Sequence, residues 1–126
     1  MEDLISIREN GEVHIHNMFG NLKFLFHMVK DSRAVDFRIF DTINTYSGTY
    51  TTGIVVLTSK KKFLIVKDVY DQKLQQFPEI PGSSVDFETW SVVSNDKKCF
   101  VLLSKGTNIY QLNLGGAAQL VVSLLY

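Results

Sequence analysis

Residues 53–65 read GIVVLTSKKKFLI, and this stretch decides the fold. Its first six residues are mostly β-branched or aliphatic, and Phe63 starts a second apolar run after a turn of polar residues. Each run has the length of an ordinary β-strand, and neither continues into a helical period. The stretch therefore predicts a β-hairpin whose turn carries the lysines.

The same hairpin pattern occurs twice more along the chain. Residues 4–15 read LISIRENGEVHI, which places Leu4 50 positions before Ile54. Residues 100–112 read FVLLSKGTNIYQL, which places Leu103 46 positions after Leu57. A repeat of about 40–50 residues with about four strands is typical of the blades of a β-propeller, which stack because one small sheet cannot bury both faces alone. An independent β-sandwich or small barrel built from similar hairpins is the alternative.

Short apolar runs separated by turn residues fill the rest of the chain. Asn10-Gly11 is the strongest hairpin signal, because both residues tolerate positive φ. No segment keeps a helical period over three turns. We predict strands at Leu4–Arg8, Val13–His16, Leu22–Met28, Ala34–Phe40, Gly53–Thr58, Phe63–Lys67, Leu74–Phe77, Trp90–Val93, Phe100–Ser104, Ile109–Leu112 and Leu120–Leu124.

The predicted fold is all-β, a single domain over residues 1–126. It is an unclosed piece of a WD40-like β-propeller with two to three four-stranded blades, and the blade-like repeats lie near residues 4–30, 34–78 and 90–125. A ring with so few blades cannot close. Its end blades are therefore expected to leave unpaired strand edges and apolar faces.

The charge balance and the cysteine content exclude several classes of protein. Lys plus Arg and Asp plus Glu number 13 each, so the formal net charge is zero, and hydrophobic residues make up 45% of the chain. Such a chain lacks the basic stripe of a nucleic-acid-binding protein, and its composition is that of a folded domain. Cys99 is the only cysteine, so no disulfide can form within the chain, and a reducing, intracellular setting is expected.

No group of residues has the spacing of a catalytic or metal site. His14 and His16 alternate along a strand and so share one face, but neither His27 nor any other side chain supplies a further ligand at an informative spacing. Cys99 opens a strand and is expected to be a small buried apolar residue. Catalysis needs a nucleophile, a base and an orienting group within reach. We therefore expect no enzymatic activity, no cofactor and no small-molecule substrate.

Two segments are candidates for contacts with a protein partner. The first is Thr42–Thr52, predicted as a long polar loop that exposes Tyr46 and Tyr50, since loops on propeller faces commonly carry contacts. The second is the basic run at the hairpin turn, which also fits an acidic ligand, a phosphoinositide or a merely solvated turn. It consists of Lys60, Lys61 and Lys62.

The order of motifs resembles the N-terminal propeller of the vacuolar protein sorting-associated protein 16 family over most of the chain. The most specific part is Phe77–Gly82 followed by Trp90–Val93, and Trp90 is expected to fill a blade core. Thr89 departs from the pattern, because many members have a cysteine before this tryptophan. The other matching stretches are Glu9–Val13, Gly20–Leu22, Asp36–Phe40, Thr52–Thr58, Lys73-Leu74, Val101–Leu103 and Ile109–Leu112.

The resemblance implies a role in membrane traffic. Members of this family join a propeller to a long α-solenoid and serve in the HOPS and CORVET complexes, which tether endosomal and lysosomal or vacuolar membranes before fusion. It implies a non-catalytic scaffold segment that acts in vesicle docking and fusion and in intracellular protein transport. Its partners are then other subunits of a class C tethering complex. Its location is cytoplasmic, peripheral on the cytosolic face of the late endosome, lysosome or vacuole. The residues themselves leave open a small independent β-domain that binds an acidic ligand or phosphoinositide through the lysine hairpin.

Overall fold

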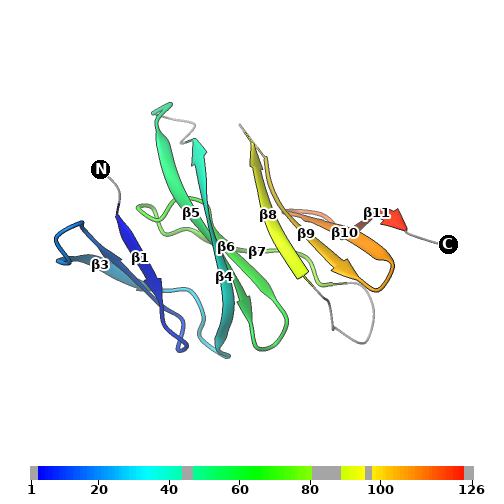
Figure 1. The fold of residues 1–126 in the computed structure, drawn as a ribbon, viewed down its shortest axis with the longest axis horizontal. Coiled ribbons are helices and arrows are strands. Elements are labelled where there is room, and N and C mark those ends of the chain that lie inside the picture. The colour runs from blue at the N-terminus through cyan, green and yellow to red at the C-terminus, as the bar shows by residue number, and fades with distance from the viewer. Residues whose placement is uncertain (1–2, 44–46, 81–88, 96–97, 124–126) are drawn as a thin grey trace.

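Every regular element of this protein that the structure describes is a β-strand (Figure 1). The computed structural model describes residues 3–43, 47–80, 89–95 and 98–123. No helix in these ranges could cross a membrane. The all-β prediction is confirmed, and each predicted strand is present with its ends within three residues of the predicted ends. The strands are β1 (Leu4–Ile7), β2 (Glu12–His16), β3 (Leu22–His27), β4 (Ala34–Ile43), β5 (Tyr50–Thr58), β6 (Phe63–Val66), β7 (Leu74–Gln76), β8 (Thr89–Asn95), β9 (Lys98–Lys105), β10 (Asn108–Asn113) and β11 (Gln119–Ser123).

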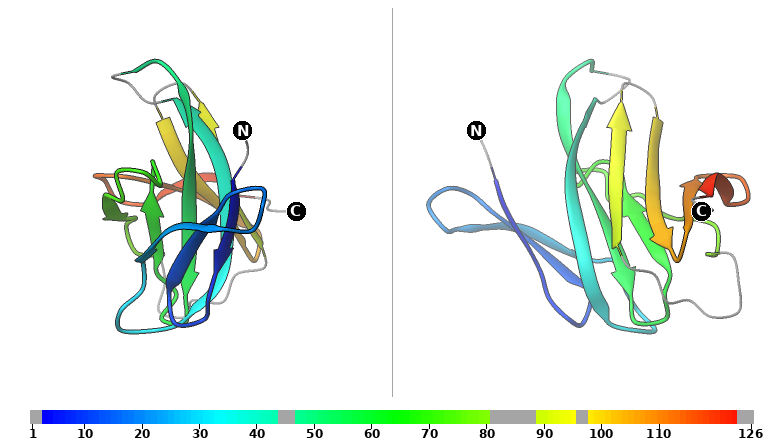
Figure 2. Two further views of the ribbon diagram at one scale, coloured as in Figure 1. Left: turned by 90° about the vertical axis from the view of Figure 1, so that its left-hand side faces the viewer. Right: turned by 45° about the vertical axis from the view of Figure 1, so that its right-hand side comes forward.

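The strands form three antiparallel sheets in which neighbours in space are neighbours in sequence. Sheet 1 has the order β1-β2-β3, sheet 2 the order β4-β5-β6-β7, and sheet 3 the order β8-β9-β10-β11. The sheets stand side by side in chain order, and none closes into a barrel (Figures 1 and 2). This arrangement agrees with an unclosed, propeller-like piece of structure.

Two hydrophobic cores hold the sheets together, one on each face of sheet 2. The core between sheets 1 and 2 contains Val13 and Ile15 from β2 and Ile54 and Val56 from β5. The core between sheets 2 and 3 contains the alternate β5 residues and side chains from β8 to β10. Residues 54–57 are therefore buried whichever face they point to, and none is more than 5% exposed. The unbroken apolar run of β5 follows from this burial on both sides, since alternation is needed only where one face meets water.

Trp90 of β8 joins sheets 2 and 3 through polar as well as apolar contacts. Its indole Nε1 donates a hydrogen bond to Asp36 Oδ2 at 3.0 Å, and the Arg38 guanidinium carbon lies 4.3 Å from the centre of the Trp90 ring. Arg38 also pairs with Asp36 Oδ1 at 2.8 Å. The ring meets Phe63 edge-on, with 5.0 Å between centroids. Trp90 is 5% exposed, so the prediction that it fills a core is confirmed.

The structure changes the residue offset between the second and third copies of the hairpin. Leu57 lies on the face of sheet 2 toward sheet 3, whereas Leu103 lies on the face of sheet 3 toward sheet 2. The 46-residue offset that pairs these two residues is therefore wrong for β9, since a shift of one residue reverses the face. Val56 is the equivalent of Leu103, 47 positions apart. Val56 pairs with Leu64, and Leu103 pairs with Tyr110, so Tyr110 is the equivalent of Leu64. The offset between these two residues is 46, because the β9–β10 turn is one residue shorter than the β5–β6 turn.

Sheet 1 differs from the other two sheets in its first strand. The repeated hairpin is β5–β6 in sheet 2 and β9–β10 in sheet 3, and in each case a preceding strand, β4 or β8, pairs with its first strand. In sheet 1 the hairpin is β1–β2, and β1 pairs with β2 alone. Within the described ranges, the second edge of β1 is unpaired.

Candidate interaction surface

Both ends of the predicted loop Thr42–Thr52 are strand, so the loop prediction is wrong for Thr42–Ile43 and for Tyr50–Thr52. β4 and β5 continue their pairing beyond the predicted ends, with Thr42 opposite Thr51 and Ile43 opposite Tyr50. Threonine and tyrosine favour a pleated backbone, which explains why this polar segment extends the hairpin. Tyr46 lies outside the described residues. Tyr50 opens β5 and is 80% exposed, so its side chain is available at the end of the hairpin.

A pocket of about 350 Å³ lies beside Tyr50, between sheet 1 and sheet 2. Asp3 and Tyr70, which line this pocket, are joined by a hydrogen bond that the Tyr70 hydroxyl donates to the Asp3 carboxylate. Lys23 Nζ lies 3.2 Å from the same carboxylate. The hydrogen bond from Tyr70 is the main cause that lowers the pKa of Asp3, and the same bond raises the pKa of Tyr70. Asp41 also lines the pocket.

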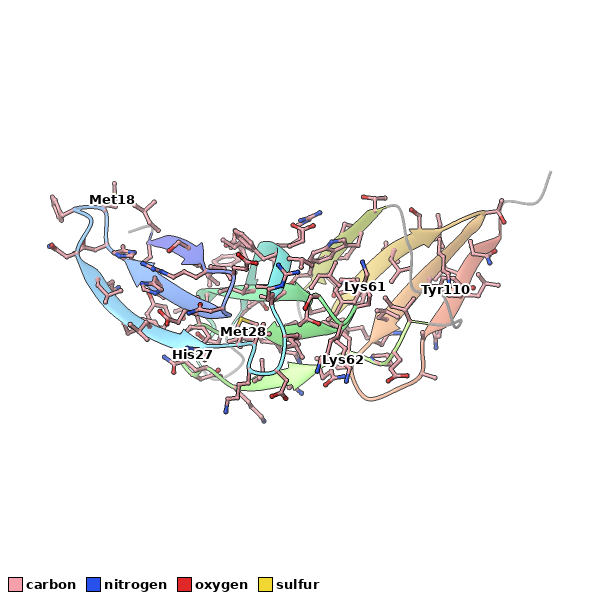
Figure 3. The ribbon with its side chains drawn as sticks, turned by 90° about the horizontal axis from the view of Figure 1, so that it is seen from below. Met18, His27, Met28, Lys61, Lys62 and Tyr110 are labelled. Carbon is pink, nitrogen blue, oxygen red and sulfur yellow. The ribbon has the colours of Figure 1, made fainter. Side chains whose placement is uncertain are left out.

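The lysine run lies at the other end of β5 from Tyr50. Lys60, Lys61 and Lys62 occupy the β5–β6 turn, where Lys61 has a φ of 62° and the Lys62 backbone N–H donates to Thr58 Oγ1 at 3.2 Å (Figure 3). A strand of nine residues spans about 26 Å at about 3.3 Å per residue. The structure therefore does not bring Tyr50 and the lysines into one site.

The histidines do not form a metal site in the described part of the chain. His14 and His16 share a face, as predicted, and their rings stack with 6.1 Å between centroids. Glu12 Oε1 lies 2.7 Å from His14 Nε2, and Glu12 Oε2 lies 3.6 Å from His27 Nε2. The hydrogen bond with His14 is the main cause that lowers the pKa of Glu12. Across residues 3–43, 47–80, 89–95 and 98–123, no three His, Cys, Asp or Glu side chains are grouped as metal ligands.

Cys99 is half-buried against the core between sheets 2 and 3. Desolvation raises the pKa of its thiol to about 11. Because the thiolate is the reactive form, such a cysteine is a poor nucleophile near neutral pH. Its contacts agree with the predicted role as a small apolar residue, although its burial is incomplete.

Two exposed apolar groups are absent from the sequence-based candidates. The β2–β3 turn presents Met18, which lies at one extreme of the molecule (Figure 3), and Phe19, which is 84% exposed. The turn is ordered by Asn17 Oδ1, which accepts the backbone N–H groups of Phe19 and Asn21 at 2.9 and 3.0 Å. The Asn-Met-Phe-Gly sequence was the signal for this tip, since turn residues there flank two large apolar ones.

The second group lies on β4, on the side that faces sheet 1. Val35, Phe37 and Ile39 are 48%, 37% and 46% exposed. They alternate with Asp36 and Arg38, which point toward sheet 3. The sequence gives no local signal that these side chains are exposed, because a strand that is covered on this face has the same alternation of apolar residues.

Comparisons with known proteins agree on one kind of relative. The profile of the family described as "Vps16, N-terminal region" matches residues 1–124. The vacuolar protein sorting-associated protein 16 homolog of Drosophila melanogaster is 24% identical over 129 residues. The matched region is all of this chain and 15% of that relative's length. No solved structure matches the chain.

Proposed function

The chain belongs to the family of the Vps16 N-terminal region, and from this membership we propose that it is a non-catalytic protein-interaction segment in vacuolar protein sorting. The observation that carries the proposal is the family match, which extends over all three sheets. The resemblance drawn from the sequence is thereby confirmed at the level of the family. Because the chain spans about 15% of its curated relative, the role of the whole relative is carried over only as a proposal.

Within this role the chain is a scaffold segment of an endosomal and lysosomal, or vacuolar, tethering complex of the HOPS or CORVET type. Its partners are other class C subunits, and it lies peripherally on the cytosolic face of the late endosome or lysosome. The architecture supports binding rather than chemistry: two apolar cores lock three sheets in place, and exposed side chains such as Tyr50 and Phe19 stand at hairpin ends. Rigid aromatic side chains of this kind are common anchors of protein interfaces.

We expect the full chain, tagged and expressed in cells, to co-purify with class C subunits and to overlap late-endosomal markers in fluorescence images. Changing Tyr50→Ala is expected to lower that recovery by at least about fivefold, because truncating a central aromatic anchor commonly costs about 2 kcal/mol of binding. Leu120→Lys is the control, since Leu120 is an exposed apolar residue on β11, far along the chain from β5.

One result would count against the sorting role, and another only against Tyr50 as a contact residue. The first is a folded chain, shown by its circular dichroism, that recovers no class C subunit above the level of an unrelated β-protein. The second is equal recovery by the Tyr50→Ala and Leu120→Lys variants, which would remove Tyr50 from the contact while leaving the sorting role in place.

A second candidate function is binding to an acidic lipid, and one observation favours it. Lys60 and Lys62 meet Lys30 around a pocket of about 260 Å³, which also includes Asp31. About 1 kcal/mol per basic residue near an anionic membrane makes this contact weak on its own. Sedimentation with phosphoinositide-containing vesicles tests it: retention that needs the anionic lipid and disappears in Lys60→Glu with Lys62→Glu would place lipid binding ahead of protein tethering.

A further inference from the structure

The pocket of about 260 Å³ beside the lysine run is formed by two turns that are hydrogen-bonded to each other. One is the connection from β3 to β4, and the other is the β5–β6 turn. The Arg33 backbone N–H donates to Ser59 Oγ at 3.0 Å, and the Ser59 backbone N–H donates to the Arg33 carbonyl oxygen at 2.8 Å. Within the second turn, the Thr58 backbone N–H donates to the Lys62 carbonyl oxygen at 2.9 Å. The two turns are therefore fixed relative to each other before any ligand binds.

The charged side chains around this pocket are mostly basic. Lys30, Lys60 and Lys62 line it together with Asp31, and we call it the lysine pocket. Three positive charges and one negative charge leave its lining with a net charge of +2, although the chain as a whole has a net charge of zero. In the described part of the chain, none of these three lysines takes part in an ion pair. A cleft that is lined mainly by one sign of charge attracts ions of the opposite sign.

Apolar and hydroxyl groups complete the lysine pocket. Met28 and Val29, which are 1% and 3% exposed, line it together with Leu64. Apolar walls exclude water, so they strengthen the attraction between a bound anion and the lysines. The Thr58 hydroxyl also lines the pocket, and it accepts the Lys62 backbone N–H at 3.2 Å. A hydroxyl that accepts one hydrogen bond can still donate its own proton to a ligand oxygen.

We propose that the lysine pocket binds a single phosphomonoester group, with Lys30, Lys60 and Lys62 as its cationic contacts. A phosphomonoester carries a charge of about −1.5 to −2 near neutral pH, which balances the charge of the lining. A carboxylate or a phosphodiester carries a single negative charge and leaves the lining with an excess of positive charge. Lysine binds phosphate as a point charge and needs no planar arrangement of acceptors.

The inference rests on the second candidate function and makes it more specific. It names the chemical group that is bound and adds Lys30, which lies outside the basic run, to the contacts. The headgroup of a phosphoinositide and a soluble phosphate ester share this chemistry. The test therefore uses both sources of the phosphomonoester.

Glycerol 3-phosphate is the soluble probe, titrated into the full chain and followed by NMR. We expect saturable shifts of the backbone amide signals of Lys30 and Lys60, and binding at least about tenfold tighter than that of dimethyl phosphate, which carries a single charge. Lys30→Gln is expected to weaken binding of glycerol 3-phosphate at least about fivefold, because one charged contact is lost. Lys67→Gln is the matched control, since Lys67 follows β6 and lines a different pocket. We expect it to leave binding unchanged.

Vesicles identify the source of the phosphomonoester. Phosphatidylcholine vesicles with a phosphatidylinositol monophosphate are compared with vesicles of equal surface charge that contain phosphatidylserine, whose phosphate is a diester. Retention on the first kind alone, lost in Lys30→Gln, assigns the pocket to a membrane headgroup. Binding of glycerol 3-phosphate without retention on either kind assigns the pocket to a soluble ester.

Three results would overturn the proposal: equal binding of glycerol 3-phosphate and dimethyl phosphate, no binding of either, or equal effects of Lys30→Gln and Lys67→Gln. Retention on both kinds of vesicle without binding of the soluble probe would also overturn it. The second candidate function would then be a general attraction to anionic membrane. Co-purification of class C subunits does not use this pocket, so its failure would count against the sorting role alone.

Discussion

Changing Trp90→Ala is expected to lower the free energy of unfolding by about 3–5 kcal/mol, the range for truncation of a large buried aromatic side chain. The loss has three sources at one position. The ring leaves a cavity in the core between sheets 2 and 3, Phe63 loses its edge-on contact, and Asp36 loses the hydrogen bond from the indole. Urea denaturation followed by circular dichroism at neutral pH measures the change.

Trp90→Phe is the control that divides these sources. Phenylalanine keeps most of the apolar volume but cannot donate to Asp36, so the expected loss is about 1–2 kcal/mol, the cost of an unmade hydrogen bond together with a small cavity. A loss below about 1 kcal/mol for Trp90→Ala would mean that sheets 2 and 3 do not depend on this contact for their stability.

Changing Gly11→Ala is expected to lower the free energy of unfolding by at least about 3 kcal/mol, because two causes add. Gly11 has a φ of +90°, which a residue with a side chain adopts at a cost of about 1–2 kcal/mol. A Cβ on Gly11 would also lie 2.6 Å from Val29 Cβ and 2.8 Å from the Val29 backbone nitrogen, and closer still to its carbonyl oxygen. Because the backbone of Val29 cannot turn aside as a flexible side chain can, the turn itself must shift.

Gly20→Ala is the matched control for this prediction. Gly20 has a φ of +84°, but a Cβ there would meet nothing within 4 Å. Its cost should therefore be the conformational part alone, about 1–2 kcal/mol. Thermal and urea unfolding of both variants compare the two positions. Equal losses would show that the contact with Val29 is relieved at no cost and that only the backbone angle matters.

The β1–β2 turn shows how far a short motif predicts structure. Asn10-Gly11 predicts a hairpin with positive φ at both positions, and the hairpin is present. In the described residues only Gly11 of the two has positive φ. The side chain of Asn10 instead accepts the Glu12 backbone N–H at 3.0 Å, and the Gly11 N–H donates to Arg8. This is a three-residue loop that ends on a glycine, another common hairpin connection. The dipeptide thus predicted the turn but not its type.

The candidate site was less predictable than the strands. Tyr50 and the lysine turn could be found as exposed polar or aromatic residues, yet they lie at opposite ends of β5. The two pockets between β1 and β4 bring Ile5 and Ile7 together with Phe37 and Ile39, which are about 30 positions away in the sequence. Since all four are ordinary apolar strand residues, their joint exposure depends on which strands surround them and leaves no mark in the local pattern.

The sequence by itself determined the all-β class, the eleven strands found in the described ranges and the repeated hairpin, because strand length, turn chemistry and apolar pattern are local properties of the chain. Tertiary structure alone decided which faces are covered. Phe37 pairs with Val56 as Trp90 pairs with Leu103, so the two aromatic residues hold equivalent positions in their sheets. Trp90 is nevertheless 5% exposed against sheet 2, whereas Phe37 is 37% exposed on the side of sheet 1. Whether a side chain is buried depends on what lies opposite it, and this is decided by how one sheet packs on another.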